Sequence, residues 1–364
     1  MNKPHSLYIH IPFCTYLCDY CDFTKLQYFS NFIYPYLDAL KVELASYDIN
    51  ELDTIYIGGG TPSSLNIDEL RYLLDIVKPY SLNVKEYSVE ANPDSLTLEK
   101  IKLLKEYHVN RISLGVESTD DKILASINRH HNFNDVIKCV SNIRSSGISN
   151  INLDLIIGLP HVSKKMIEKD IANLISLDVN HISCYSLTVN PHTKFYIDGI
   201  IPPTDDISRE YYDLVNTKLI EAGYIHYEIS NWAKPCYQSL HNMTYWRNDR
   251  YYGVGLGASG YIKDIRYTNT KSINKYLAHK FIFEKEKVTM SSDMNYMIML
   301  NLRTIEGLNL KEFNDKFHID LLKVKRNELE ELISNHFLVL ENGIIKPTYE
   351  GMMILDSIIL KLFL

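Results

Sequence analysis

Three cysteines lie close together near the start of the chain, in the segment YIHIPFCTYLCDYCDF at residues 8–23. Cys14, Cys18 and Cys21 follow a C-x3-C-x2-C spacing directly after a strand-like run. A structural zinc site usually takes four ligands, often as two separated pairs, and no second C-x2-C pair occurs downstream. Zinc held by these cysteines and His10 is one interpretation. An iron–sulfur cluster is the other, because thiolates are its usual protein ligands.

A four-iron cluster explains better why there are three thiols rather than four. Three thiolates leave one iron atom without a protein ligand, and that atom can bind the amino and carboxylate groups of S-adenosylmethionine. Electron transfer from the cluster can then break the C–S bond of this ligand, which is chemistry that a cofactor supplies and a protein positions. The other cysteines, Cys139, Cys184 and Cys236, stand singly, and we interpret them as small apolar side chains.

A scaffold of alternating strands and helices must position the cysteine loop. Amphipathic stretches with helical spacing separate six short β-branched or aromatic runs, a pattern that indicates parallel βαβ units. Such units predict an α/β fold, either an incomplete barrel or an open sheet. The runs lie at residues 6–11, 54–60, 86–91, 111–117, 151–158 and 181–189.

Polar residues gather at the ends of these predicted strands. The carboxyl-terminal edge of a parallel sheet or barrel is where ligands bind. We therefore expect one ligand site at this edge, built from Gly58 to Thr61, Glu90, Glu117, Asp154 and Thr188.

The pattern changes after about residue 230. Residues 231–290 are rich in aromatics and glycine without a clear period, and we predict that they connect two domains. Residues 291–364 combine helices with a hairpin that turns at Asn342-Gly343, which predicts a smaller, mainly helical, winged-helix-like domain. The apolar run at residues 352–364 is too short and too charged to span a bilayer, so we expect a buried terminal helix.

Composition narrows the classes of partner and the compartment. The 364 residues are 46% hydrophobic and 23% charged, with a net charge of -7, which argues against an electrostatic grip on nucleic acid. A strand-like segment begins almost at once, so we expect no signal peptide. Clustered thiols suit a reducing compartment, and we expect a cytoplasmic protein with at most peripheral contact with a membrane.

Several motifs together resemble a known family. The cysteine spacing is the radical SAM signature, and the longer segment is similar to the oxygen-independent coproporphyrinogen III dehydrogenase family. This resemblance implies a partial (β/α)6 radical SAM barrel at residues 1–230, a [4Fe-4S] cluster and S-adenosylmethionine. It runs through GGGTPS (58–63), VEANPDSL (89–96), RISLGVES (111–118), INR (127–129), LDLIIGLP (153–160) and HNMTYW (241–246).

The resemblance also implies roles for individual residues. Cys14, Cys18 and Cys21 would hold the cluster, and Tyr8 and Tyr20 would lie against it and the adenosylmethionine. Glu117 and Asn190 depart from the family pattern, which usually has Gln and Glu at these positions, so the ligand contact of Glu117 is open. The remaining adenosylmethionine contacts would come from Gly58, Gly59, Gly60, Thr61, Glu90, Arg129 and Asp154.

Three features favour the heme chaperones of this family over its dehydrogenases. Phe23 stands where the dehydrogenases carry a further cysteine, and the signature begins at Tyr8 without their long N-terminal extension. The motif HNMTYW is associated with heme binding, and His241 would be the axial ligand of the heme iron. We therefore predict transfer of heme to acceptor proteins, with respiratory cytochromes as candidates. The alternatives are oxidative decarboxylation of coproporphyrinogen III and a purely structural metal-binding protein.

Overall fold

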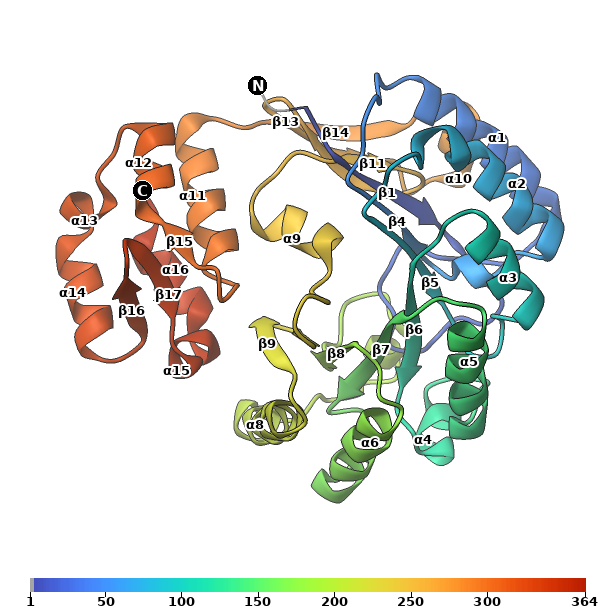
Figure 1. Cartoon of the computed structure of the whole chain (residues 1–364), viewed down its shortest axis with the longest axis horizontal. Coiled ribbons are helices and arrows are strands. Elements are labelled where there is room, and N and C mark those ends of the chain that lie inside the picture. The colour runs from blue at the N-terminus through green and yellow to red at the C-terminus, as the bar shows by residue number, and fades with distance from the viewer. Residues whose placement is uncertain (1–2) are drawn as a thin grey trace.

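Six parallel strands form the centre of the computed structural model, which describes residues 3–364 (Figure 1). They are buried on both faces, as their near-continuous apolar sequences require. Each of the six predicted strands is confirmed to within three residues at its ends. The strands are β1 (Ser6–Ile11), β4 (Thr54–Gly59), β5 (Glu86–Ala91), β6 (Arg111–Glu117), β7 (Asn150–Ile157) and β8 (His181–Ser186).

Helices cover the outer face of these strands and connect each strand to the next (Figure 1). Capping boxes at Asn66 and Asn132 fix where two of the helices begin. The covering elements are α1 (Ser30–Ala45), α2 (Ile67–Val77), α3 (Leu98–Glu106), α4 (Asp121–Ser126), α5 (Phe133–Ser145), α6 (Lys164–Ser176) and α8 (Asp205–Glu221). The repeated strand–helix order makes this part of the chain the expected α/β unit.

The segment between residues 225 and 287 extends the central sheet rather than only linking two domains. β11 (Tyr252–Val254) pairs in parallel with β1 at one edge. At the other edge β10 (Asn231–Ala233) runs antiparallel to β8, and β9 (Ile225–Glu228) pairs with β10. A separate three-stranded sheet follows, formed by β12 (Ser259–Ile262), β13 (Ile265–Asn269) and β14 (Ile282–Lys287).

The C-terminal unit has its own hydrophobic core. Its three-stranded sheet has the order β15-β17-β16, and the Asn342-Gly343 turn has φ angles of 52° and 79° at its two residues, as a tight hairpin needs. The expected terminal helix is present and buries its apolar face. The elements are α11 (Met290–Asn301), β15 (Leu308–Asn309), α12 (Leu310–Phe317), α13 (Leu321–Val324), α14 (Arg326–Ser334), β16 (Leu338–Glu341), β17 (Ile344–Pro347), α15 (Tyr349–Met353) and α16 (Leu355–Leu362). Helices and a small hairpin in this order confirm the winged-helix-like architecture.

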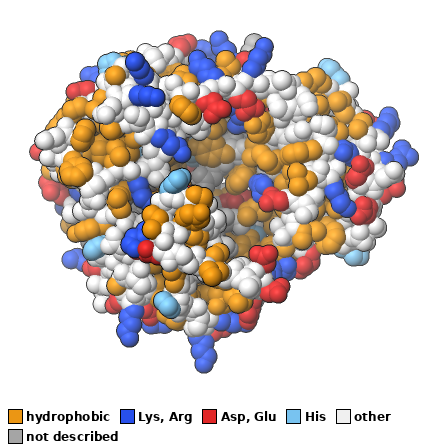
Figure 2. All heavy atoms as spheres, turned by 180° about the vertical axis from the view of Figure 1, so that it is seen from behind, with side chains coloured by type: hydrophobic (Ala, Val, Ile, Leu, Met, Phe, Trp, Pro, Cys, Tyr) orange, Lys and Arg blue, Asp and Glu red, His pale blue; other side chains and the backbone are white. Residues whose placement is uncertain are grey.

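The surface carries both signs of charge. On the face opposite to the view of Figure 1, lysines and arginines are interspersed with aspartates and glutamates (Figure 2). No helix in residues 3–364 is both long enough and apolar enough to cross a membrane.

Candidate functional site

One cavity of about 390 Å³ brings together most of the residues predicted from the sequence. This volume is within the usual range for a small-molecule site. The cavity lies inside the barrel, because the strand residues that line it alternate along each strand. Residues that follow the carboxyl ends of the strands, such as Thr61 and Thr188, also line it. The predicted residues that line it are Cys14, Cys18, Cys21, Tyr20, Gly59, Gly60, Thr61, Glu90, Glu117, Arg129, Asp154, Thr188 and Asn190.

The cysteine loop follows β1 and is held against the strand ends by hydrogen bonds. The short strand β2 (Phe13–Cys14) pairs with β3 (Leu26–Gln27), and Thr61 donates a hydrogen bond from its backbone nitrogen to the carbonyl of Phe13, at 2.9 Å. The Thr61 hydroxyl lies 3.5 Å from the sulfur of Cys14. Burial raises the pKa of the Cys14 thiol to about 11 and also raises that of Cys21.

The thiols fit a cluster better than a single metal ion. Within residues 3–364 no set of three His, Cys, Asp or Glu side chains converges as the ligands of one ion must. A four-iron cluster takes each thiolate on a different iron, so its ligands need not converge in this way. His10 is not available as a fourth zinc ligand, because its Nδ1 is bonded to the Tyr8 hydroxyl at 2.9 Å and its Nε2 to the Thr24 carbonyl at 2.7 Å.

The glycine run at the end of β4 is needed for close packing against three neighbouring groups. A Cβ atom on Gly58 would lie 2.7 Å from the Glu90 carboxyl carbon, and one on Gly60 would lie 2.9 Å from the Cys14 sulfur. Gly59 has a φ of 116°, and a Cβ there would lie 2.6 Å from the His10 ring. The run therefore lets the loop, the acid and the histidine approach the same strand end. From the sequence, these glycines were expected only as contacts of a ligand.

Glu90 presents its carboxylate to the cavity from the end of β5. It accepts hydrogen bonds from the Tyr56 hydroxyl at 2.8 Å and from the Gly59 backbone nitrogen at 2.9 Å. Burial raises its pKa to about 7, although both hydrogen bonds favour the charged form. The hydrogen bonds from the Tyr56 hydroxyl and from the Gly59 backbone nitrogen thus fix the orientation of the carboxylate.

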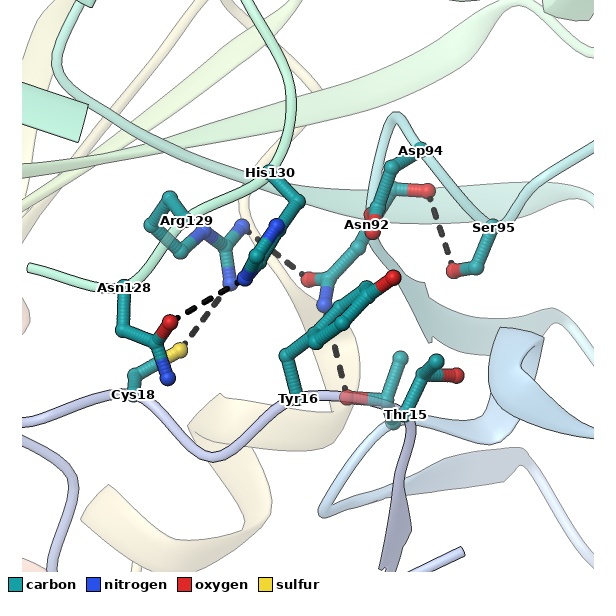
Figure 3. A pocket seen from close by; sticks show the side chains of 10 residues that line it. Thr15, Tyr16, Cys18, Asn92, Asp94, Ser95, Asn128, Arg129 and His130 are labelled. Atoms are coloured by element: carbon teal, nitrogen blue, oxygen red, sulfur yellow. Dashed lines mark hydrogen bonds between the residues drawn. The ribbon is translucent and has the colours of Figure 1, made fainter. Parts of the chain in front are cut away.

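Arg129 points toward Cys18 of the cysteine loop and toward Asn92 (Figure 3). Its guanidinium is 3.6 Å from the Cys18 sulfur, 3.1 Å from the Asn92 side-chain oxygen and 3.9 Å from the Glu117 carboxylate. Its Nε is buried without a hydrogen-bond partner. Such an orphaned donor is what an anionic group of a ligand would satisfy.

Glu117, the departure from the family pattern, occupies an irregular place at the end of β6. Its φ is 67°, and the pairing of β6 with β7 shifts register between Gly115 and Glu117. Burial raises its pKa to about 7, and the nearby Arg129 opposes that shift. The side chain lines the cavity, so the structure brings it to the predicted site.

Asp154 lies on β7 in a shared network of polar side chains. It accepts a hydrogen bond from Asn152 at 2.8 Å and one from Ser113 at 3.4 Å. Burial raises its pKa. The network makes Asp154 part of the cavity wall rather than an isolated ion pair.

Several residues of the cavity were missed from the sequence, and Arg111 is the most unusual. It is 2% exposed, and its Nε and Nη1 have no hydrogen-bond partner. It begins β6, where polar or small residues at every second position face the cavity, a period-2 signal that the sequence did contain. Among the other missed residues are Tyr56, Asn92, Ser113, Asn152, Ser183, Tyr185 and Asn242.

Tyr8, Gly58 and His241 lie outside the cavity wall. Tyr8 stacks on Tyr56, with ring centroids 6.1 Å apart. His241 is 1% exposed, and its ring nitrogens are bonded to the hydroxyls of Thr54 and Tyr245, both at 2.8 Å. In this structure His241 therefore has no free nitrogen for a heme iron, and axial ligation would first require the Tyr245 or the Thr54 hydroxyl to leave.

Comparisons with known proteins agree with this geometry. Residues 8–174 match the radical SAM superfamily and residues 292–354 match the HemN C-terminal domain. The chain is 37% identical to the heme chaperone HemW of Lactococcus lactis over 100% of this chain and 98% of that protein. It is 38% identical to the heme chaperone HemW of Bacillus subtilis over 95% and 96% of the two chains.

A solved structure shares the whole fold. The coproporphyrinogen III oxidase HemN of Escherichia coli, a radical SAM enzyme, superposes with a TM-score of 0.87 over 99% of this chain and 90% of that one. The two sequences are 20% identical, so this likeness concerns the fold alone. It confirms the expected combination of a radical SAM barrel with a smaller C-terminal domain.

Proposed function

The chain belongs to the heme chaperone HemW family of radical SAM proteins, and on this premise we propose that it binds heme and passes it to acceptor proteins. The proposal includes a [4Fe-4S] cluster on Cys14, Cys18 and Cys21 and S-adenosylmethionine in the adjoining cavity. The observation that carries the cluster and adenosylmethionine part of the proposal is that the three thiols and Glu90 line one cavity at the strand ends.

The donor set of the cavity suits a cluster with one open iron. Gly60 leaves the space that the Cys14 sulfur needs, and the Thr61 hydroxyl and the Arg129 guanidinium lie beside two of the sulfurs. Positive charge and hydrogen-bond donors near thiolates stabilise their charged form. Lys25 donates hydrogen bonds to the backbone carbonyls of Cys18 and Cys21 and so ties the loop together.

The rest of the cavity suits the other parts of adenosylmethionine. When bound, the cluster and this ligand supply one-electron chemistry at the C–S bond. Glu90 would accept hydrogen bonds from the ribose hydroxyls with the oxygen lone pairs that Tyr56 and Gly59 leave free. Arg129 would pair with the ligand carboxylate, which would satisfy its orphaned Nε. Tyr20, Glu117 and Asp154 would complete the wall.

Heme binding and the heme acceptor are proposed from the family alone. The Lactococcus lactis and Bacillus subtilis relatives are named heme chaperones, and a heme protein in the same compartment would be the acceptor. We place that compartment in the cytoplasm, with respiratory cytochromes at the membrane as candidate acceptors. The net charge of -7 argues against an electrostatic grip on nucleic acid.

A transfer assay separates this function from dehydrogenation. Protein with a reconstituted cluster is loaded with heme under anaerobic conditions and mixed with vesicles that carry heme-depleted respiratory cytochromes. We expect the Soret band of the cytochromes to appear faster than heme is lost to apomyoglobin, which accepts heme passively. Equal rates for the two acceptors would contradict a chaperone role. Formation of protoporphyrinogen IX from coproporphyrinogen III would instead identify the dehydrogenase.

A further inference from the structure

The short helix α9 (Leu240–Trp246), which carries the HNMTYW motif, packs against the amino-terminal end of the barrel strands. Ser6 on β1 bonds to Thr244 through their hydroxyls at 2.8 Å, and Thr54 on β4 bonds to His241. Glu86 on β5 accepts hydrogen bonds from the backbone nitrogens of Leu240 and His241, at 2.9 and 3.0 Å. Three neighbouring strands thus hold this helix in one orientation.

The ring of His241 packs against Tyr56, a residue of the cavity wall. It stacks on the Tyr56 ring, with centroids 5.2 Å apart and an interplanar angle of 28°. The hydroxyl of Tyr56 then donates the 2.8 Å hydrogen bond to Glu90. The Tyr8 ring also stacks on Tyr56, with centroids 6.1 Å apart. A flat aromatic side chain packed against two other rings has little freedom to rotate, so its hydroxyl stays directed at the carboxylate.

Two hydrogen bonds fix the His241 ring in turn. Thr54 binds Nδ1 and Tyr245 binds Nε2, and the Tyr245 ring packs edge-on against Tyr251 at 4.7 Å. Because burial lowers the pKa of His241 to about 3, the ring is neutral, with one nitrogen donating and one accepting. Both hydroxyl partners can serve either tautomer. Both nitrogens of the His241 ring are therefore hydrogen-bonded in this position.

We propose that His241 is a positioning residue of the adenosylmethionine cavity, acting through Tyr56 on Glu90, rather than an iron ligand. The motif then matters for ligand binding because of its buried ring and not because of a free nitrogen. This inference rests on the proposed function, since it assumes that Glu90 contacts adenosylmethionine.

The test compares three variants in anaerobically reconstituted protein. His241→Leu removes the ring that supports Tyr56, Tyr56→Phe keeps the ring stack and removes the hydroxyl, and the double variant combines both changes. We expect each single variant to weaken adenosylmethionine binding by about tenfold, as loss of one net hydrogen bond would. If His241 acts through Tyr56, the double variant binds no more weakly than Tyr56→Phe alone.

Heme titration of the same variants supplies the second measurement. We expect the heme spectrum of His241→Leu to match that of the wild type. Tyr245→Phe frees Nε2 of His241, and we expect it to leave the heme spectrum unchanged as well. Thermal unfolding and iron content, measured for every variant, show whether a loss of binding reflects a loss of fold.

Different results would overturn different statements. An altered heme spectrum in His241→Leu with unchanged adenosylmethionine affinity would make His241 an iron ligand. Independent, additive losses in the double variant would show that His241 does not act through Tyr56. If His241→Leu does not fold, Tyr245→Phe still decides, because a stronger heme band would show that a freed His241 binds iron. Wild-type protein that binds no adenosylmethionine would overturn the proposed function and this inference together.

Discussion

Replacing Glu90 with Gln should weaken adenosylmethionine binding without disturbing the cluster. The side chains have nearly the same shape, so Gln can accept from the Gly59 nitrogen with its oxygen and donate to the Tyr56 hydroxyl with its amide. What changes is the negative charge and the number of acceptors offered to the ribose. The substitution changes none of the three cysteines proposed to bind the cluster.

The expected size of the effect follows from the kind of bond that is lost. A hydrogen bond to a charged group typically contributes about 1.5–3 kcal/mol. That corresponds to a rise in the dissociation constant of between about tenfold and about a hundredfold. Isothermal titration calorimetry on anaerobically reconstituted protein at pH 8 measures it directly.

The pH dependence gives a sharper test. The pKa of Glu90 is raised to about 7 by burial, so the carboxylate is charged at pH 8 and mostly protonated at pH 6. A protonated acid is a poorer acceptor, so wild-type affinity should fall as the pH is lowered through 7. Glu90→Gln cannot titrate and should lack this part of the fall. The difference between the two proteins separates Glu90 from Glu117 and Asp154, whose pKa values are also raised.

Glu228→Gln is the matched control. Glu228 is fully buried, burial also raises its pKa to about 7, and it lies outside the cavity wall. Its replacement should leave both the affinity and its pH dependence unchanged. Equal affinities of wild type and Glu90→Gln at pH 8, or identical pH profiles, would refute the assignment of Glu90 to the ribose.

Two further predictions concern the cluster and the fold. Serine at any one of the three cavity cysteines (Cys14, Cys18, Cys21) should abolish the cluster in iron and sulfide analysis, whereas serine at Cys139, buried in α5, should leave it intact. Glu43→Ala should lower the free energy of unfolding in urea by about 3–5 kcal/mol, because the donors of Gly255, Asn269 and Tyr276 lose their buried acceptor. Unfolding at the wild-type midpoint would show that water replaces the acceptor.

The sequence predicted the parts of the fold that depend on local pattern. Each parallel strand is a run of β-branched and aromatic residues, long enough to be recognised on its own. The cavity followed from the same pattern, because parallel strands carry their carboxyl ends to one edge. This is why Glu90, Glu117 and Asp154, which are far apart in the sequence, were expected at one site and line one cavity.

The parts that were missed depend on distant contacts. β11 is three residues long and is defined by its pairing with β1, more than two hundred residues earlier in the chain. A segment this short has no period of its own. Arg111 was missed because it begins a strand, where a charged residue is ordinarily exposed, yet here it lies within the barrel at 2% exposure.

The environment of His241 shows what a sequence motif does not predict. The motif HNMTYW identifies an imidazole and its sequence neighbours but not the direction in which the ring points. One signal was available, since His241 and Tyr245 are four residues apart and therefore lie on one face of a helix, within bonding distance. The other partner, Thr54, lies on a different strand and could not be inferred from the motif.

Buried carboxylates connect the barrel to the segment after residue 230. Glu86 on β5 is satisfied by the backbone of α9, and Glu43 on α1 is satisfied by Gly255 and Asn269 from the following strands. Without these donors each carboxylate would be buried unpaired, which proteins tolerate poorly. The docked helix α9 therefore supplies hydrogen bonds that the Glu86 carboxylate needs in its buried position. The same helix places the His241 ring against Tyr56, whose hydroxyl donates the hydrogen bond to Glu90 in the cavity.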